Sequence, residues 1–100
     1  MRLLQISIRF FTSLREIIGK KEELLEFAQG EIVTVDRVFK TLAEFYGESF
    51  VEYIYDRETT NVKSYLQVLV NGKNASTLNG LQTELKNRDV LAILPPVSGG

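Results

Sequence analysis

The sequence VLAILPPVSGG, residues 90–100, contains the segment that decides the expected fold. Its first five residues, Val90–Leu94, are all apolar, which is typical of a strand that is covered on both faces. We therefore expect this strand to lie in the middle of a sheet, with a helix on one face and loops or a partner on the other. Pro95 and Pro96 follow directly, and because proline has no backbone N–H, the strand cannot continue through them.

Three other segments show the alternation of apolar and polar residues that is typical of half-buried strands. Residues 4–10 show it most clearly. Residues 24–27 form a weaker candidate, because the glutamates around them would equally suit a helix, and we expect them to pair antiparallel with the first strand. Residues 65–70 complete the set, and Asn71-Gly72 after them accepts the positive φ of a tight turn.

The clearest helix is predicted over residues 35–46, where apolar residues recur at i, i+3, i+4, i+7 and i+11. Thr34 is placed to cap its N-terminus and Gly47 to end it. A shorter helix is predicted near residues 13–16, because Ser13-x-x-Glu16 has the form of a capping box. Gly19 can end that helix with a positive φ.

The order of these elements is strand, strand, helix, strand, short segment, strand. Residues 48–64 are expected to add only a short helical turn and a mobile loop. We predict an α+β fold, a β-grasp or ubiquitin-like roll, with a mixed four- to five-stranded sheet and one main helix packed across it. The first and last strands would lie side by side and parallel. The predicted division is a β-grasp domain over residues 1–94 and an extended tail over residues 95–100.

The amino-acid composition excludes several classes of function. The chain has 100 residues, which suits a single small domain, and its 12 Lys and Arg against 13 Asp and Glu make it nearly neutral. It therefore lacks the strong positive electrostatic field that would attract nucleic acid or an anionic membrane. It contains no Cys and no His, so thiol nucleophiles, disulfides and imidazole metal sites are excluded. No apolar run is long enough for a membrane helix, and we expect a cytoplasmic protein.

The tail has an unusual combination of residues. Pro95 and Pro96 favour an extended exit from the sheet, so six residues could reach about 18 Å from the domain. Gly99 and Gly100 have no side chains, so this backbone can pass through a channel too narrow for a Cβ. A final Gly-Gly alone fits a frayed end. Together with a buried strand and two prolines, it indicates a terminal carboxylate presented for chemistry.

Other patterns have simpler structural explanations. Ser98 lacks a histidine or cysteine to activate it, and we interpret it as a residue small enough for a narrow channel. Asp89 and Glu84 could form an acid and base pair, but Asp89 lies in a turn before a strand, where aspartate is ordinarily structural. Five phenylalanines are expected to pack in the core or form an apolar docking face rather than stack on bases: Phe10, Phe11, Phe39, Phe45 and Phe50.

The sequence resembles the small subunit of molybdopterin synthase, within the wider class of ubiquitin-like sulfur carriers. The most specific match is the tail Leu94–Gly100, and the resemblance covers nearly the whole chain. Arg88 departs from the glycine that is common in the family, and Val90 replaces a residue that is often polar. Asn87 or Arg88 is therefore expected to take a strained turn conformation. Further matches are Arg9-Phe10-Phe11, Leu14-Arg15-Glu16, Gly19, Thr34-Val35, Leu42, Val70-Asn71-Gly72, Leu85 and Asp89.

The resemblance implies a non-catalytic carrier subunit rather than an enzyme alone. In this family the carboxylate equivalent to that of Gly100 is adenylated with ATP by a ubiquitin-activating-type adenylyltransferase, and sulfur then displaces AMP to leave a thiocarboxylate. The tail enters the large catalytic subunit of molybdopterin synthase, in a heterotetramer, and its sulfur builds the dithiolene of molybdopterin. No cofactor or metal is expected on the chain itself. The implied site consists of Gly100 and Gly99 for the chemistry and Pro95, Pro96, Val97 and Ser98 for partner binding.

The sequence is therefore compatible with three classes of function. The first is the sulfur carrier of molybdenum or tungsten cofactor synthesis, or of another pathway. The second is a ubiquitin-like modifier that is joined to lysines of other proteins through the same Gly-Gly terminus. The third is an interaction domain whose end is inert. The mass of the protein recovered from cells distinguishes them, because only the first two change the terminal carboxylate.

Overall fold

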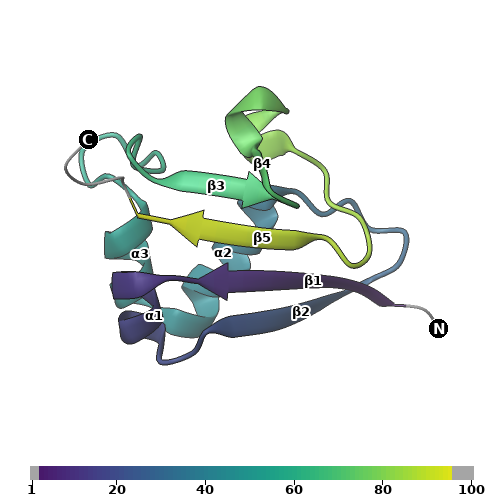
Figure 1. Ribbon diagram of the computed structural model, residues 1–100, viewed down its shortest axis with the longest axis horizontal. Coiled ribbons are helices and arrows are strands. Elements are labelled where there is room, and N and C mark those ends of the chain that lie inside the picture. The colour runs from purple at the N-terminus through teal and green to yellow at the C-terminus, as the bar shows by residue number, and fades with distance from the viewer. Residues whose placement is uncertain (1–2, 96–100) are drawn as a thin grey trace.

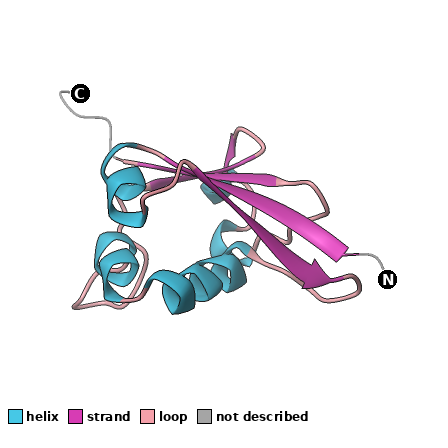
Figure 2. Cartoon of the chain, turned by 90° about the horizontal axis from the view of Figure 1, so that it is seen from below, coloured by secondary structure: helices cyan, strands magenta, loops and turns pink. Residues whose placement is uncertain are grey.

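The computed structural model describes residues 3–95, and it forms a five-stranded mixed sheet with its helices packed against one face (Figures 1 and 2). The strands lie in the order β2-β1-β5-β3-β4. No helix within these residues is long and apolar enough to cross a bilayer. The elements are β1 (Leu3–Phe10), α1 (Thr12–Ile18), β2 (Glu22–Ala28), α2 (Val35–Tyr46), α3 (Glu48–Ile54), β3 (Gln67–Val70), β4 (Lys73–Asn74), the 3₁₀ turns η1 (Ala75–Thr77) and η2 (Gly80–Gln82), and β5 (Val90–Leu94).

The last strand is central, as its apolar composition predicts. β5 pairs in parallel with β1, where Ser7 lies opposite Val90, and antiparallel with β3, where Gln67 lies opposite Leu94. β2 pairs antiparallel with β1 over its whole length, so the weaker strand prediction is also confirmed. The inward side chains of the four longer strands pack with α2 and α3. The fully buried side chains include Ile6, Ile8, Phe10, Leu14, Val33, Val35, Val38, Phe39, Leu42, Phe50, Ile54 and Leu91.

The main helix begins and ends at the predicted residues. The Thr34 hydroxyl accepts a hydrogen bond from the Arg37 amide at 3.2 Å, which satisfies one of the free N–H groups of the first turn. Asp36 and Lys40 form an i,i+4 ion pair at 3.0 Å on the exposed side. Gly47 has a φ of 70°, a conformation that glycine adopts without a Cβ penalty, and the helix stops there.

The capping box predicted for α1 is wrong. The helix begins at Thr12, immediately after β1, and its N-cap residue is Phe11, which makes no side-chain cap. Ser13 is therefore already inside the first turn, so its hydroxyl does not occupy the capping position. The other end of α1 follows the prediction, because Gly19 has a φ of 83° and its amide bonds the Arg15 carbonyl at 2.8 Å.

Residues 48–64 contain more regular secondary structure than the short helical turn and mobile loop that were predicted. Residues 48–54 form the complete helix α3, and the following loop is closed by backbone hydrogen bonds. The Lys63 amide donates to the Ile54 carbonyl and the Asp56 amide to the Asn61 carbonyl, both at 2.8 Å. The loop thereby folds back along the end of α3.

A polar network holds the start of β5. The Asp89 carboxylate accepts from the Asn71 side-chain amide at 2.9 Å and from the Lys86 amide at 2.7 Å. The Asn71 side chain accepts in turn from the Val90 amide at 2.9 Å. Arg88 has a φ of 72°, so it takes the strained conformation predicted for this turn. The network connects the β3–β4 turn to β5 and sets the register of the central strand.

Candidate functional site

The candidate site is the point where β5 leaves the sheet. Ile93 lies opposite Phe10 of β1 and Val68 of β3, and Leu94 lies opposite Gln67. Pro95 is half-buried and is the last residue that the structure describes. Because proline has no N–H to donate, the hydrogen-bond ladders end at Leu94. The remaining predicted site residues, Pro96, Val97, Ser98, Gly99 and Gly100, lie outside the described residues.

Exposed apolar side chains lie at this end of the sheet. β1 and β5 are parallel and α1 follows β1 directly, so α1 lies at the end where β5 leaves, next to α3 (Figure 1). Ile17 of α1 is 43% exposed, and Tyr65, just before β3, is 53% exposed. The Lys63 ammonium is 6.0 Å from the centre of the Tyr65 ring. A shallow hollow of about 330 Å³ lies between α1 and α3, and we call it the exit hollow; it is lined by Ile17, Ser49, Glu52, Tyr53 and Lys63.

The second surface beside the exit is the face of the sheet that no helix covers (Figure 2). The strand register places Leu69, Ala92 and Arg9 in one row across it, and Ser7 between Leu24 and Val90 in the next. None of these residues is buried. We call this surface the outer sheet face. β5 therefore has its predicted helical cover on one side only, and its other side is open to a partner.

One cluster of titratable side chains is formed by Lys20, Glu23 and Tyr46. The Tyr46 hydroxyl donates to the Glu23 carboxylate, and the Lys20 ammonium lies 3.2 Å from the same oxygen. The hydrogen bond from Tyr46 lowers the pKa of Glu23, and burial raises the pKa of Tyr46. The contact with Glu23 raises the pKa of Lys20. This cluster joins the end of α2 to the start of β2.

The other residues considered from the sequence have structural positions. Both Asp89 oxygens accept hydrogen bonds within the turn before β5, so Asp89 is structural, as predicted. Glu84 is exposed and its backbone bridges Thr34. Phe10, Phe39 and Phe50 are fully buried, whereas Phe45 is 61% exposed on the outside of α2. Within residues 3–95, no three His, Cys, Asp or Glu side chains are grouped closely enough to hold a metal ion.

One surface feature has no counterpart among the predictions from sequence. A groove forms between α2, α3 and the loop that follows α3, and it is described below. The signal that could have indicated it is the recurrence of glutamate at every fourth position, Glu44, Glu48 and Glu52, across two consecutive helices. The other side of the groove, however, is built by the loop of residues 55–62, which is closed by backbone hydrogen bonds that no periodic pattern indicates.

A mixed sheet with parallel first and last strands, one long helix across it and a central strand that leads directly into a Gly-Gly tail defines the class of ubiquitin-like β-grasp carriers and modifiers. The family model named ThiS matches residues 8–100. The chain belongs to the ThiS family, and it is thereby a ubiquitin-like protein of the sulfur carrier and modifier type.

Individual relatives agree with this assignment. Small archaeal modifier protein 3 of Haloferax volcanii is 32% identical over 97 residues, which is 97% of this chain and 100% of the relative. The solution structure of small archaeal modifier protein 1 from Methanosarcina acetivorans has a TM-score of 0.78 and 32% identity, covering 100% of both chains. A putative molybdopterin converting factor, subunit 1, from Pyrococcus furiosus has a TM-score of 0.71 and 24% identity, covering 94% of this chain and 99% of that one, and supports the fold alone.

Proposed function

We propose that the chain is a sulfur carrier whose reactive group is the α-carboxylate of Gly100. A carboxylate is a poor acyl electrophile, so an adenylyltransferase of the ubiquitin-activating type first joins it to the AMP of ATP and releases pyrophosphate. A sulfur nucleophile then displaces AMP at the same carbon and leaves a thiocarboxylate. The observation that supports this best is that β5, held on both sides by neighbouring strands, ends at Leu94, directly before the residues PPVSGG.

The tail residues have separate parts in this proposal. Pro95 and Pro96 stiffen the base of the tail, because each fixes φ near −65°. Val97 and Ser98 contact the walls of the partner's channel. Gly99 passes the narrowest part of that channel, where a Cβ would obstruct the backbone, and Gly100 carries the sulfur. The groups that stabilise charge on the reacting carbonyl belong to the partner enzymes.

The specific role that we propose is the small subunit of molybdopterin synthase, acting in the cytoplasm. The thiocarboxylate enters the large catalytic subunit, in a heterotetramer, and its sulfur passes to a cyclic pyranopterin phosphate to form the dithiolene. The outer sheet face and the exit hollow are the surfaces that would contact the large subunit, since both border the end of β5 and both present exposed apolar side chains. The residues quoted from the tail and the Val70-Asn71-Gly72 turn support this role.

A second candidate function is protein modification. The similarity to small archaeal modifier protein 3 extends over 97% of this chain and favours it. In that case the Gly100 adenylate is attacked by the amino group of a lysine, and the product is an isopeptide bond rather than a thiocarboxylate. Both functions need the same activated carboxylate, so one domain could serve both.

Intact mass spectrometry of the protein recovered from the cells that make it tests these functions. Replacement of one oxygen by sulfur adds about 16 Da and identifies the carrier. Covalent products on lysines of other proteins identify the modifier. A terminus that is unmodified under all conditions contradicts both and supports an inert interaction domain. Addition of the large subunit and the pyranopterin precursor to the thiocarboxylated protein then tests the specific role, since dithiolene formation should consume one sulfur per tail.

A further inference from the structure

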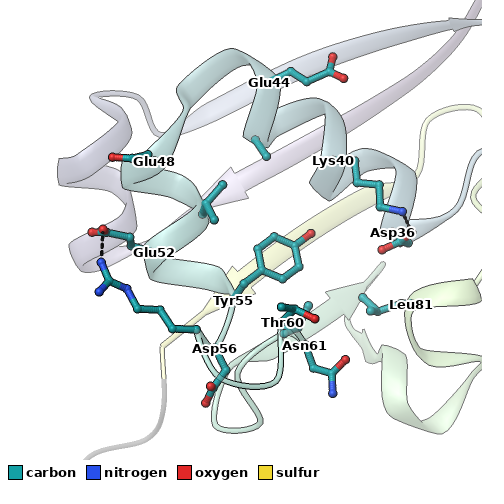
Figure 3. A pocket seen from close by; sticks show the side chains of 14 residues that line it. Asp36, Lys40, Glu44, Glu48, Glu52, Tyr55, Asp56, Thr60, Asn61 and Leu81 are labelled. Carbon is teal, nitrogen blue, oxygen red and sulfur yellow. Dashed lines mark hydrogen bonds and ion pairs between the residues drawn. The ribbon is translucent and has the colours of Figure 1, made fainter.

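A groove runs along the side of the molecule where α2 and α3 lie, away from the outer sheet face (Figure 3). It has a volume of about 800 Å³, within the range of sites that hold several side chains. α2 and α3 form one wall, and residues 55–62 with Leu81 form the other. It shares only Glu52 with the exit hollow, so the two surfaces are distinct.

The floor of the groove is apolar. It is formed by Ala43, Val51, Tyr55, Val62 and Leu81. Val51 is 38% exposed, so its side chain is accessible from the groove. The Tyr55 ring lies across the groove in Figure 3, and its backbone bridges Val62, so the floor is fixed by the fold. Burial raises the pKa of the Tyr55 hydroxyl, and the negative charge of nearby Asp36 raises it further. The hydroxyl is therefore protonated at neutral pH and can donate a hydrogen bond.

The rim of the groove is acidic. Five carboxylates line it against two cations: Asp36, Glu44, Glu48, Glu52 and Asp56 against Lys40 and Arg57. Both cations are already engaged, Lys40 with Asp36 at 3.0 Å and Arg57 with Glu52 at 2.8 Å. Glu44 and Glu48 are exposed and make no ion pair within residues 3–95.

The negative charge of the rim is not explained by the overall charge of the chain. The whole chain has a formal net charge of −1, whereas the groove lining alone has three more carboxylates than cations. The carboxylates are also spread along two helices and do not converge on one point, and the described residues contain no group that could hold a metal. A complementary ligand therefore needs several separated positive charges and an apolar surface between them.

We propose that this groove binds a basic amphipathic segment of a partner protein, with apolar side chains against Val51 and Tyr55 and Lys or Arg side chains beside Glu44 and Glu48. The apolar side chains of such a segment would cover the exposed floor of the groove, and its Lys or Arg side chains would pair with the carboxylates that make no ion pair within the described residues. The proposal does not depend on the chemistry of the tail, because the groove is built from other residues. A partner held here leaves the outer sheet face free.

Binding can be tested on the full chain with three synthetic peptides of about 14 residues, roughly four helical turns. The first is an amphipathic Leu/Lys peptide, the second has Glu in place of every Lys, and the third has Ser in place of every Leu. In spectra of the ¹⁵N-labelled protein, the first should shift the amides of Val51, Tyr55 and Val62, and the other two should not. Equal binding of the Leu/Glu or the Ser/Lys peptide overturns the proposal, as do shifts confined to the outer sheet face.

Charge-reversal variants provide the second test. Glu44→Lys with Glu48→Lys should weaken binding of the Leu/Lys peptide about tenfold at low salt. The matched control is Glu16→Lys with Glu26→Lys, which changes the net charge equally at exposed positions outside the groove and should leave the affinity within about twofold. The amide spectra show whether each variant is folded. If the control weakens binding as much as the groove variant, the attraction is general and the groove is not the site.

Discussion

The two ends of β5 are built from different kinds of contact. At its start, polar groups satisfy one another within the chain, as Asp89 does with Asn71 and Lys86. At its end, the neighbouring side chains are apolar and partly exposed, as Ile17 and Tyr65 show. The first end therefore holds the strand in register, while the second leaves apolar side chains partly exposed. A small domain can thus combine a fixed base with an open end on the same strand.

The largest effect on function is expected at the open end. Deleting Gly100 should abolish sulfur transfer, because the reactive carboxyl would then lie one residue too far from the partner's catalytic groups. The melting temperature should stay within about 2 °C, since residues 3–95 already form a buried core among themselves. A reconstituted transfer assay and a thermal melt measure the two quantities. Sulfur transfer at the normal rate by the shortened protein would refute the role of Gly100.

At the fixed end, the expected effect is on stability. Asp89→Ala removes two hydrogen-bond acceptors, one from the Lys86 amide and one from the Asn71 side-chain N–H, which should cost about 2 kcal/mol of unfolding free energy. For a domain of this size the melting temperature should fall by about 8–16 °C. Sulfur transfer per folded molecule should not change. Glu84→Ala is the control, because this exposed side chain makes no hydrogen bond or ion pair among the described residues, and its effect should stay below about 0.5 kcal/mol.

A smaller effect is expected when apolar surface at the open end is removed. Tyr65→Ala should weaken binding of the large catalytic subunit about tenfold, since exposed aromatic side chains at interfaces are frequent anchors. Stability should change little. The matched control is Leu78→Ala, which removes a side chain that is 42% exposed in the segment between η1 and η2. Calorimetric titration gives both affinities, and a loss that is equal in the two variants would contradict a specific contact at the exit.

The smallest effect concerns the Lys20, Glu23 and Tyr46 cluster, which lies at neither end of β5. The pKa of Glu23 is lowered in the folded protein, so its contribution to stability is present above its unfolded value of about 4.5 and is lost as the pH falls through the lower folded value. Tyr46→Phe removes the hydrogen bond that lowers the pKa most and should cost about 1 kcal/mol at pH 7. The difference from the native protein should shrink below about pH 4. Urea unfolding at several pH values measures it, and a difference independent of pH would exclude this cause.

Sequence patterns predicted the parts of the fold that depend on local periodicity. Val90–Leu94 is apolar at every position and is the central strand, and Thr34 and Gly47 cap α2 as expected. The errors occur where the local pattern does not decide the structure. Ser13 matches a capping motif, but α1 follows the end of β1 directly, and its N-cap, Phe11, lies two residues before Ser13. The loop after α3 is closed by backbone hydrogen bonds such as that from the Lys63 amide to the Ile54 carbonyl. Bonds of this kind leave no periodic pattern in the sequence, so the loop could not be predicted.

The end of β5, where the candidate site begins, was predictable for a different reason. Its exit depends on Pro95 at the end of β5, and both the strand and the proline are visible in the sequence. The groove beside Val51 and Tyr55 was not predictable, because its lining comes from α2, α3, the loop after α3 and Leu81, which enclose a surface only when the loop is closed. Local patterns therefore identify where a chain leaves its fold more readily than where two segments enclose a surface.

The pairing of β5 on both sides also has a mechanical consequence. A pull along the strand at Pro95 would load the ladders with β1 and β3 in shear, so that several hydrogen bonds resist together instead of opening one after another. An edge strand such as β2 has a ladder on one side only, so the same load would pass to a single neighbouring strand. A force applied at the end of β5 would therefore be shared between two neighbouring strands.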